Sequence, residues 1–175
     1  KNRNQIDIRK QKFPFYSIED IKFRIVRDLL LGQNDYKTIM LKMFKSKNFN
    51  YKNFLDKVFI SEAELLKMKI KGHTFGLHSH SHPTRLVDLT YEQQKDEYTK
   101  NLTKLAKLIK VDKTDIKTMS HPSGSYNNDT LKILEKLGIE LGFIQVLNNN
   151  KKSKSNYSYL EISRQDQSNI LKILN

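Results

Sequence analysis

The sequence predicts an α/β protein, and the order of its elements is the main reason. From residue 61 onward, segments with helical periodicity alternate with short apolar segments that are typical of strands. The expected order over this part is helix, strand, helix, strand, helix, strand, strand, helix. Alternation of this kind favours parallel strands joined by right-handed crossovers. In such sheets the loops at the carboxyl ends of the strands carry function.

The first third of the chain has a helical pattern instead. Ser17 is a suitable N-cap for a first helix, and Gly32 can end it. Aromatic residues are dense in this part, and packing within a small helical layer explains them better than a ligand site does. We expect one domain over residues 1–175, made of a loose N-terminal segment (1–16), a helical insertion (17–59) with helices at 17–31, 35–46 and 50–57, and an α/β core (60–175).

Two capping boxes mark the starts of later helices. In Ser61–Glu64 and Thr90–Gln93, the first hydroxyl can cap the helix while the last side chain reaches back. Asp166 can cap a final helix. After residue 60 the expected helices are 61–71, 90–110, 128–137 and 168–174, the expected strands are 73–78, 116–120, 142–147 and 159–162, and residues 148–158 form a polar loop.

Histidines cluster in one short segment. Four of the five histidines lie within the ten residues 73–82, and histidine is the commonest protein ligand for zinc and similar metals. Gly72 and Gly76 disfavour a helix here, so a strand that runs into a loop is expected. This context favours metal binding by His78 and His82, with a histidine-rich loop that binds no metal as the alternative.

A second loop, over residues 121–127, follows the expected strand 116–120 and is rich in turn-forming residues. Both this loop and the histidine loop come at the carboxyl end of a strand. We therefore expect the two loops to face one site.

The amino-acid composition limits the class of protein and the kinds of site that are possible. Hydrophobic residues make up 37% and charged residues 29% of the chain, which suits a globular protein. No apolar run approaches the roughly 18–20 residues that span a membrane, so no membrane span is expected. The absence of cysteine excludes disulfides and thiolate zinc sites. The sequence leaves the location open between the cytoplasm and the cell envelope.

A net charge of +13 raises the question of an anionic partner such as nucleic acid. The lysines are spread along the helices and no nucleic-acid-binding motif accompanies them. The charge is therefore better explained as a compositional bias, and nucleic-acid binding is the least favoured function.

The motifs together resemble a known family. Residues 61–146 resemble the polysaccharide deacetylases of the NodB-homology type, on the strength of the segments Ser61–Leu66, Gly72–Pro83 and His121–Asn127, and the helix and glycine that follow. The resemblance implies a partial or distorted (β/α) barrel. It also implies a metal-dependent hydrolase that removes N-acetyl groups from an amino sugar in a polysaccharide or glycan precursor. A divalent metal, expected to be zinc, would be the cofactor, and an N-acetylated carbohydrate would be the substrate.

The resemblance also implies roles for individual residues. His78 and His82 match the two metal-ligand histidines of the family. The residues that match the loop lining the acetyl pocket are Pro122, Ser123 and Gly124, where the Ser123 N–H would help to hold the oxyanion. Arg164 and Asp166 resemble a supporting Arg-x-Asp stretch.

The chain departs from the family pattern in ways that bear on activity. It contains no Asp-Asp pair, which in the family supplies a metal ligand and the general base, and Ser120 replaces an arginine. The family's late acid histidine has no counterpart after His121, so His121 and His80 are the candidates for that role. We expect this chain, by itself, to bind metal weakly and to be inactive, either because the missing motif lies upstream or because the protein is a catalytically silent, carbohydrate-binding relative.

Overall fold

The computed structural model describes residues 2–31, 33–83, 85–145, 158–164 and 170. The chain divides into two compact units, residues 1–59 and 60–175, and each is described by itself. Among the helices of the described residues, none is both long and apolar enough to cross a membrane.

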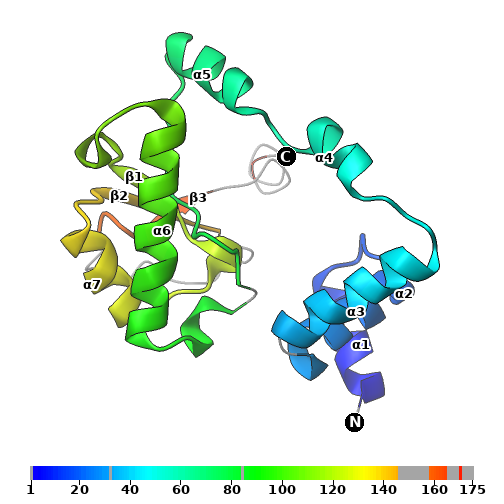
Figure 1. Cartoon of the computed structure of the whole chain (residues 1–175). Coiled ribbons are helices and arrows are strands. Elements are labelled where there is room, and N and C mark those ends of the chain that lie inside the picture. Colours follow the sequence, from blue (N-terminus) through cyan, green and yellow to red (C-terminus); the bar gives the residue numbers. More distant parts are fainter. Residues whose placement is uncertain (1, 32, 84, 146–157, 165–169, 171–175) are drawn as a thin grey trace. The chain divides into compact units, whose positions relative to one another are not determined.

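The first unit is helical, as its sequence pattern predicts (Figure 1). Ser17 caps the second helix in a capping box with Asp20. Residues 2–12, which were expected to be loose, form a helix instead. Contacts outside that helix explain the difference, because Arg9 pairs with Asp28 at 3.2 Å and Lys10 donates to the Tyr16 carbonyl at 2.6 Å. The helices of this unit are α1 (Asn2–Lys12), α2 (Ile18–Ile25) with a π-helical continuation (Val26–Leu30), α3 (Gln33–Ser46) and α4 (Lys52–Val58).

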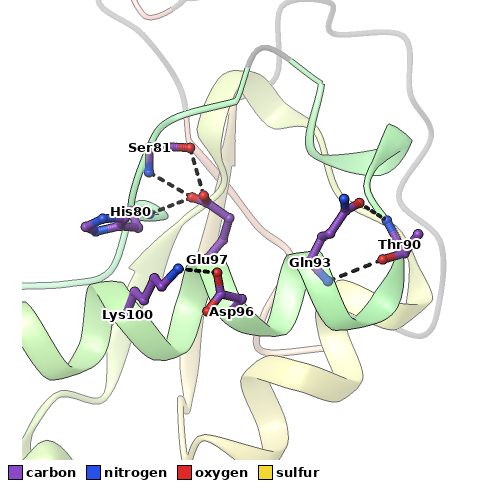
Figure 2. A network of polar contacts seen from close by, with 7 residues as sticks. All are labelled: His80, Ser81, Thr90, Gln93, Asp96, Glu97 and Lys100. Carbon is purple, nitrogen blue, oxygen red and sulfur yellow. Dashed lines mark hydrogen bonds and ion pairs between the residues drawn. The ribbon is translucent and has the colours of Figure 1, made fainter. Parts of the chain in front are cut away.

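From α6 to β3, the second unit has the predicted order of helices and strands. Both capping boxes are present, and Figure 2 shows the Thr90–Gln93 pair at the start of α6. The helices are α5 (Glu62–Ile70), α6 (Tyr91–Ile109) and α7 (Asn128–Lys136), the strands are β1 (Thr118–Ser120), β2 (Leu141–Gln145) and β3 (Ile162–Arg164), and 3₁₀ turns cover Leu86–Asp88, Lys113–Asp115 and Pro122–Gly124.

The three strands form a parallel sheet in the order β1-β2-β3, with Thr118 opposite Leu141 and Phe143 opposite Ile162. Helices α6 and α7 contact each other beside this sheet (Figure 1). The α/β class and the parallel pairing are thus confirmed. The three strands do not test closure into a distorted barrel, which stays a prediction.

The expected strand 73–78 is wrong except at one residue. Leu77 alone pairs with Met119 of β1 in a parallel bridge. After Leu77 the extended segment ends, because the backbone of Ser79 is left-handed at φ 61°.

Two other expectations near the C-terminus have different outcomes. The strand expected at 159–162 lies at 162–164, because a turn in which the Glu161 N–H donates to the Ser158 carbonyl precedes it. The expected helix 168–174, apart from residue 170, and the 148–158 loop, apart from residue 158, lie outside the described residues, as does Asp166.

The core of the second unit joins the helices to the sheet. Its buried residues include Leu77, Tyr98, Leu102, Met119, Ile133, Leu134 and Leu160. A buried polar contact also joins α6 to α7, since the Thr130 hydroxyl donates to Gln94 Oε1 at 2.6 Å. The loops that follow the strands therefore begin at residues of a packed core.

Candidate functional site

The histidine loop and the 121–127 loop lie side by side, because they leave neighbouring segments of the sheet. His78 follows the bridge residue Leu77, and His121 follows the last residue of β1. The His78 Nδ1 lies 2.7 Å from the Ser120 carbonyl oxygen, which ties the first loop to the start of the second.

The rings of His78 and His82 are suitably placed to share a metal ion. Their centroids lie 5.0 Å apart and their planes are inclined by 60°. Two imidazoles that share a tetrahedral zinc at a Zn–N distance of about 2.0 Å have ring centroids about 5 Å apart. The contact between His78 Nδ1 and a carbonyl oxygen favours a proton on that nitrogen, which leaves Nε2 as the ligand atom. The donor set and its spacing thus fit a divalent metal such as zinc.

The loop that carries these rings has an unusual backbone. Ser79 and His82 both have left-handed conformations, at φ 61° and φ 53°. Such conformations cost on the order of 1–3 kcal/mol for a residue other than glycine and are maintained by the surrounding structure. Part of that support is local, because the largely buried Ser79 accepts the His82 N–H on its hydroxyl at 3.2 Å.

Side chains of helix α6 accept hydrogen bonds from the same loop. The Glu97 carboxylate accepts the backbone N–H groups of His80 and Ser81 at 2.9 and 2.8 Å and the Ser81 hydroxyl at 2.7 Å (Figure 2). Asn101, one helical turn further on, accepts the His78 N–H at 2.9 Å. Sequence reasoning missed both residues. The available signal was their four-residue spacing beside the inward-facing Tyr98 and Leu102.

His121 is a buried side chain, only 2% exposed. Its Nε2 lies 2.8 Å from the Leu160 carbonyl oxygen, and its ring stacks on Tyr126 with centroids 4.3 Å apart. Burial is the main cause that lowers the pKa of His121; the Leu160 and Glu161 contacts oppose this shift, and His78 adds to it. The ring is therefore neutral at neutral pH, with a proton on Nε2 that it donates to Leu160. Among the described residues, its buried Nδ1 has no hydrogen-bond partner.

The residues Pro122, Ser123 and Gly124 form a tight 3₁₀ turn next to His121. Ser123 is left-handed at φ 53° and Gly124 at φ 66°, and the Gly124 N–H donates back to the His121 carbonyl at 3.1 Å. Ser125 closes the far side, where its hydroxyl accepts the Val87 N–H at 3.2 Å. The turn is thus fixed at both ends.

The remaining predicted residues are more scattered. His80 is exposed, and its described hydrogen bond is the one from its backbone to Glu97. Arg164 is exposed at the end of β3, in register with Gln145 of β2. Asp166 lies outside the described residues. Within the described part of the chain, no group of three or more histidine, aspartate, glutamate or cysteine side chains could hold a metal ion, so His78 and His82 form a pair without a third ligand.

Comparison with known proteins agrees with the motifs. The family model described as polysaccharide deacetylase matches residues 30–142, which is more than half of the chain. The chain therefore belongs to the polysaccharide deacetylase family. A comparison with curated proteins gave no match.

Two solved structures share its fold. The Streptococcus pyogenes deacetylase PplD, in complex with acetate, has a TM-score of 0.53 at 18% identity; the alignment covers 98% of this chain and 86% of that one. IcaB from Ammonifex degensii has a TM-score of 0.50 at 16% identity, with 66% of this chain and 52% of that one covered. This chain thus spans about half of the IcaB structure. At these identities the likeness concerns the fold.

Proposed function

We propose that the protein acts as a metal-dependent hydrolase that removes N-acetyl groups from an amino sugar in a polysaccharide or a glycan precursor. The observation that carries this proposal is the His78–His82 pair, with ring centroids 5.0 Å apart, in a polysaccharide deacetylase sequence. The neighbouring turn with Ser123 and the family's distorted (β/α) barrel complete the proposed setting.

In this proposal His78 and His82 hold a divalent metal, and zinc is the ion we favour. Such a metal supplies Lewis acidity and lowers the pKa of a bound water. The Ser120 carbonyl orients the His78 ring through Nδ1. The backbone N–H of Ser123 is proposed to donate to the oxyanion that forms from the acetyl carbonyl.

The leaving amine also needs a proton donor. We considered His80 and His121 for this role. Burial lowers the pKa of His121, so its neutral ring is a poor donor at neutral pH. His80 is exposed and is the better candidate of the two. Arg164 and Asp166 are proposed as supporting residues near the last strand.

Two histidines are fewer than a catalytic zinc site needs. Such sites have three protein ligands and an open position for water. We therefore propose that a further ligand, of the aspartate type that the family uses, completes the centre. These 175 residues by themselves should bind metal weakly and be inactive.

A catalytically silent, carbohydrate-binding relative is the second candidate. The lack of an Asp-Asp pair and the serine at position 120 favour it. A nucleic-acid-binding domain comes third and rests on the net charge of +13 alone.

The test compares acetate release with the binding of sugar and of DNA. The natural gene product is mixed with zinc and an N-acetylglucosamine oligomer. The hydrolase predicts acetate release that His82→Ala abolishes. Oligomer binding without acetate release would instead support the silent relative, and a salt-dependent shift of DNA with no sugar binding would support the third candidate.

A further inference from the structure

The histidine loop needs support from outside itself. It contains two residues in left-handed conformations, Ser79 and His82, and its described residues make one backbone bridge to the sheet, at Leu77. Left-handed residues other than glycine persist only where the surroundings fix them. Some part of the fold must therefore hold this backbone in place.

Glu97 provides most of the described polar contacts to the middle of the loop. One carboxylate oxygen, Oε2, accepts the N–H groups of His80 and Ser81, at 2.9 and 2.8 Å. The other oxygen, Oε1, accepts the Ser81 hydroxyl at 2.7 Å. Figure 2 shows the Glu97 side chain rising from α6 toward these groups. Hydrogen bonds to an ionised acceptor are stronger than those between neutral groups.

Asn101 holds the start of the loop in the same way. Its Oδ1 accepts the His78 N–H at 2.9 Å. Glu97 and Asn101 are one turn apart on a helix that Tyr98 and Leu102 anchor in the core. One rigid helix therefore fixes the backbone at His78 and at the residues just before His82, while both rings stay outside these contacts.

We propose that Glu97 and Asn101 form a backbone clamp: two positioning residues that set the separation of the His78 and His82 rings and so prepare the loop to bind metal. The role in metal binding rests on the proposed function, whereas the contacts to the loop do not. Neither residue ligates the metal. Their effect is on the backbone from which the two ligands extend, as with the outer contacts that orient ligands at other metal sites.

The chain contains a matched control for Glu97. Asp96 is its neighbour on α6, carries the same charge, and pairs with Lys100 at 2.6 Å, whereas Glu97 bonds to His80 and Ser81 (Figure 2). The variants Glu97→Ala and Asp96→Ala therefore remove one surface carboxylate each, and only the first removes the clamp. Glu97→Gln is a conservative variant, because its amide oxygen can still accept both N–H groups.

The first readout is amide hydrogen exchange in the full chain without metal. The clamp predicts that exchange at His80 and Ser81 becomes at least about tenfold faster in Glu97→Ala, is partly restored in Glu97→Gln, and is unchanged in Asp96→Ala. Asn101→Ala should have the same effect at His78. Equal exchange in Glu97→Ala and Asp96→Ala would overturn the clamp whether or not the chain binds metal.

The second readout is zinc affinity, followed through the shifts of the histidine ring resonances at zinc concentrations high enough for a weak site. Loss of an outer-shell contact costs roughly 10–100-fold in metal affinity, and we expect this range for Glu97→Ala with no change for Asp96→Ala. Unchanged affinity in Glu97→Ala would overturn the positioning role. If the unmodified chain and the natural gene product both bind no zinc, the proposed function and the positioning role fail together, and amide exchange still decides whether the clamp exists.

Discussion

The two loops at the edge of the sheet hold their histidines in opposite ways. The histidine loop is held mainly by hydrogen bonds to its backbone: Glu97 and Asn101 accept main-chain N–H groups, and the ring of His78 is exposed. The neighbouring loop is held by contacts to a side chain: His121 is buried, hydrogen-bonded to Leu160 and stacked on Tyr126.

This difference separates residues that can bind a ligand from residues that hold the fold. The ring of His78 is exposed and makes one described contact, between Nδ1 and the Ser120 carbonyl oxygen, which leaves Nε2 for a metal. A buried ring that joins two distant segments contributes to stability instead. The two loops should therefore respond differently to the same kind of substitution.

The largest effect on stability is expected for His121→Ala. The change leaves the Leu160 carbonyl without its donor, opens a cavity and removes the stacking contact with Tyr126. Together these losses should lower the free energy of unfolding by about 3 kcal/mol, as measured by chemical denaturation. His73→Ala, at an exposed position with no expected metal contact, is the control. Similar unfolding curves for the two variants would contradict a structural role for His121.

The same variant should alter the pH dependence of stability. Burial lowers the pKa of folded His121 below its ordinary value of 6.5, so the unfolded chain takes up a proton on this ring first as the pH falls. The unmodified protein therefore loses stability on acidification below that value, and His121→Ala lacks this contribution. The stability gap between the two proteins should narrow as the pH falls, and a gap that widens would contradict the assignment.

Gly76→Ala tests the base of the histidine loop. A Cβ at this position would lie 2.7 Å from Thr118 Oγ1 and 2.9 Å from the Thr118 carbonyl oxygen. Since the second neighbour is backbone of β1, the strand must shift, and we expect a loss of about 2 kcal/mol in unfolding free energy. Thr74→Ala, two residues earlier and exposed, should change it little. Equal stability of both variants would mean that the segment has more room than this contact allows.

Tyr126→Phe removes one hydroxyl and keeps the stacked ring. That hydroxyl donates to Glu161 Oε1 at 2.8 Å, and burial, together with this bond, raises the pKa of Tyr126 to about 12. Loss of the bond should lower the unfolding free energy by about 1 kcal/mol. Tyr159→Phe, at a largely exposed tyrosine, serves as the control. A change as large as that of His121→Ala would show that the hydroxyl, and not the ring, holds this loop.

The sequence predicted the parts of the fold that depend on local patterns. The Ser61 and Thr90 capping boxes, the helices they begin and the parallel order of the strands all follow from residue spacing, and the structure contains them. The strand expected at 73–78 was wrong except at Leu77, which pairs with Met119 of β1. How many residues of a segment find such a distant partner is not contained in a local pattern.

The candidate site, like the fold, could be predicted from the sequence only in part. The spacing of His78 and His82 indicated that their rings belong together, and they lie 5.0 Å apart, although metal binding itself stays a prediction. The burial of His121 was not predictable, because it depends on Leu160, 39 residues further along the chain. Glu97 was missed for a related reason: the sequence does not show that the fold brings the histidine loop, 16 and 17 residues away, to this helical glutamate.

The smallest effect on stability, and the largest on metal binding, is expected for His78→Ala and His82→Ala. Both side chains are exposed, and water can replace the contact between His78 and Ser120. The free energy of unfolding should therefore change by less than about 0.5 kcal/mol, whereas zinc-induced changes in the ring resonances of the remaining histidine should disappear. Denaturation curves and a zinc titration on the same samples separate the two effects. A loss of stability close to that of His121→Ala would mean that these rings are structural after all, and unaltered zinc binding in both variants would place any metal elsewhere. If both expectations hold, the contrast between a loop held by its backbone and a loop held by its side chain accounts for which histidine is free to act as a ligand.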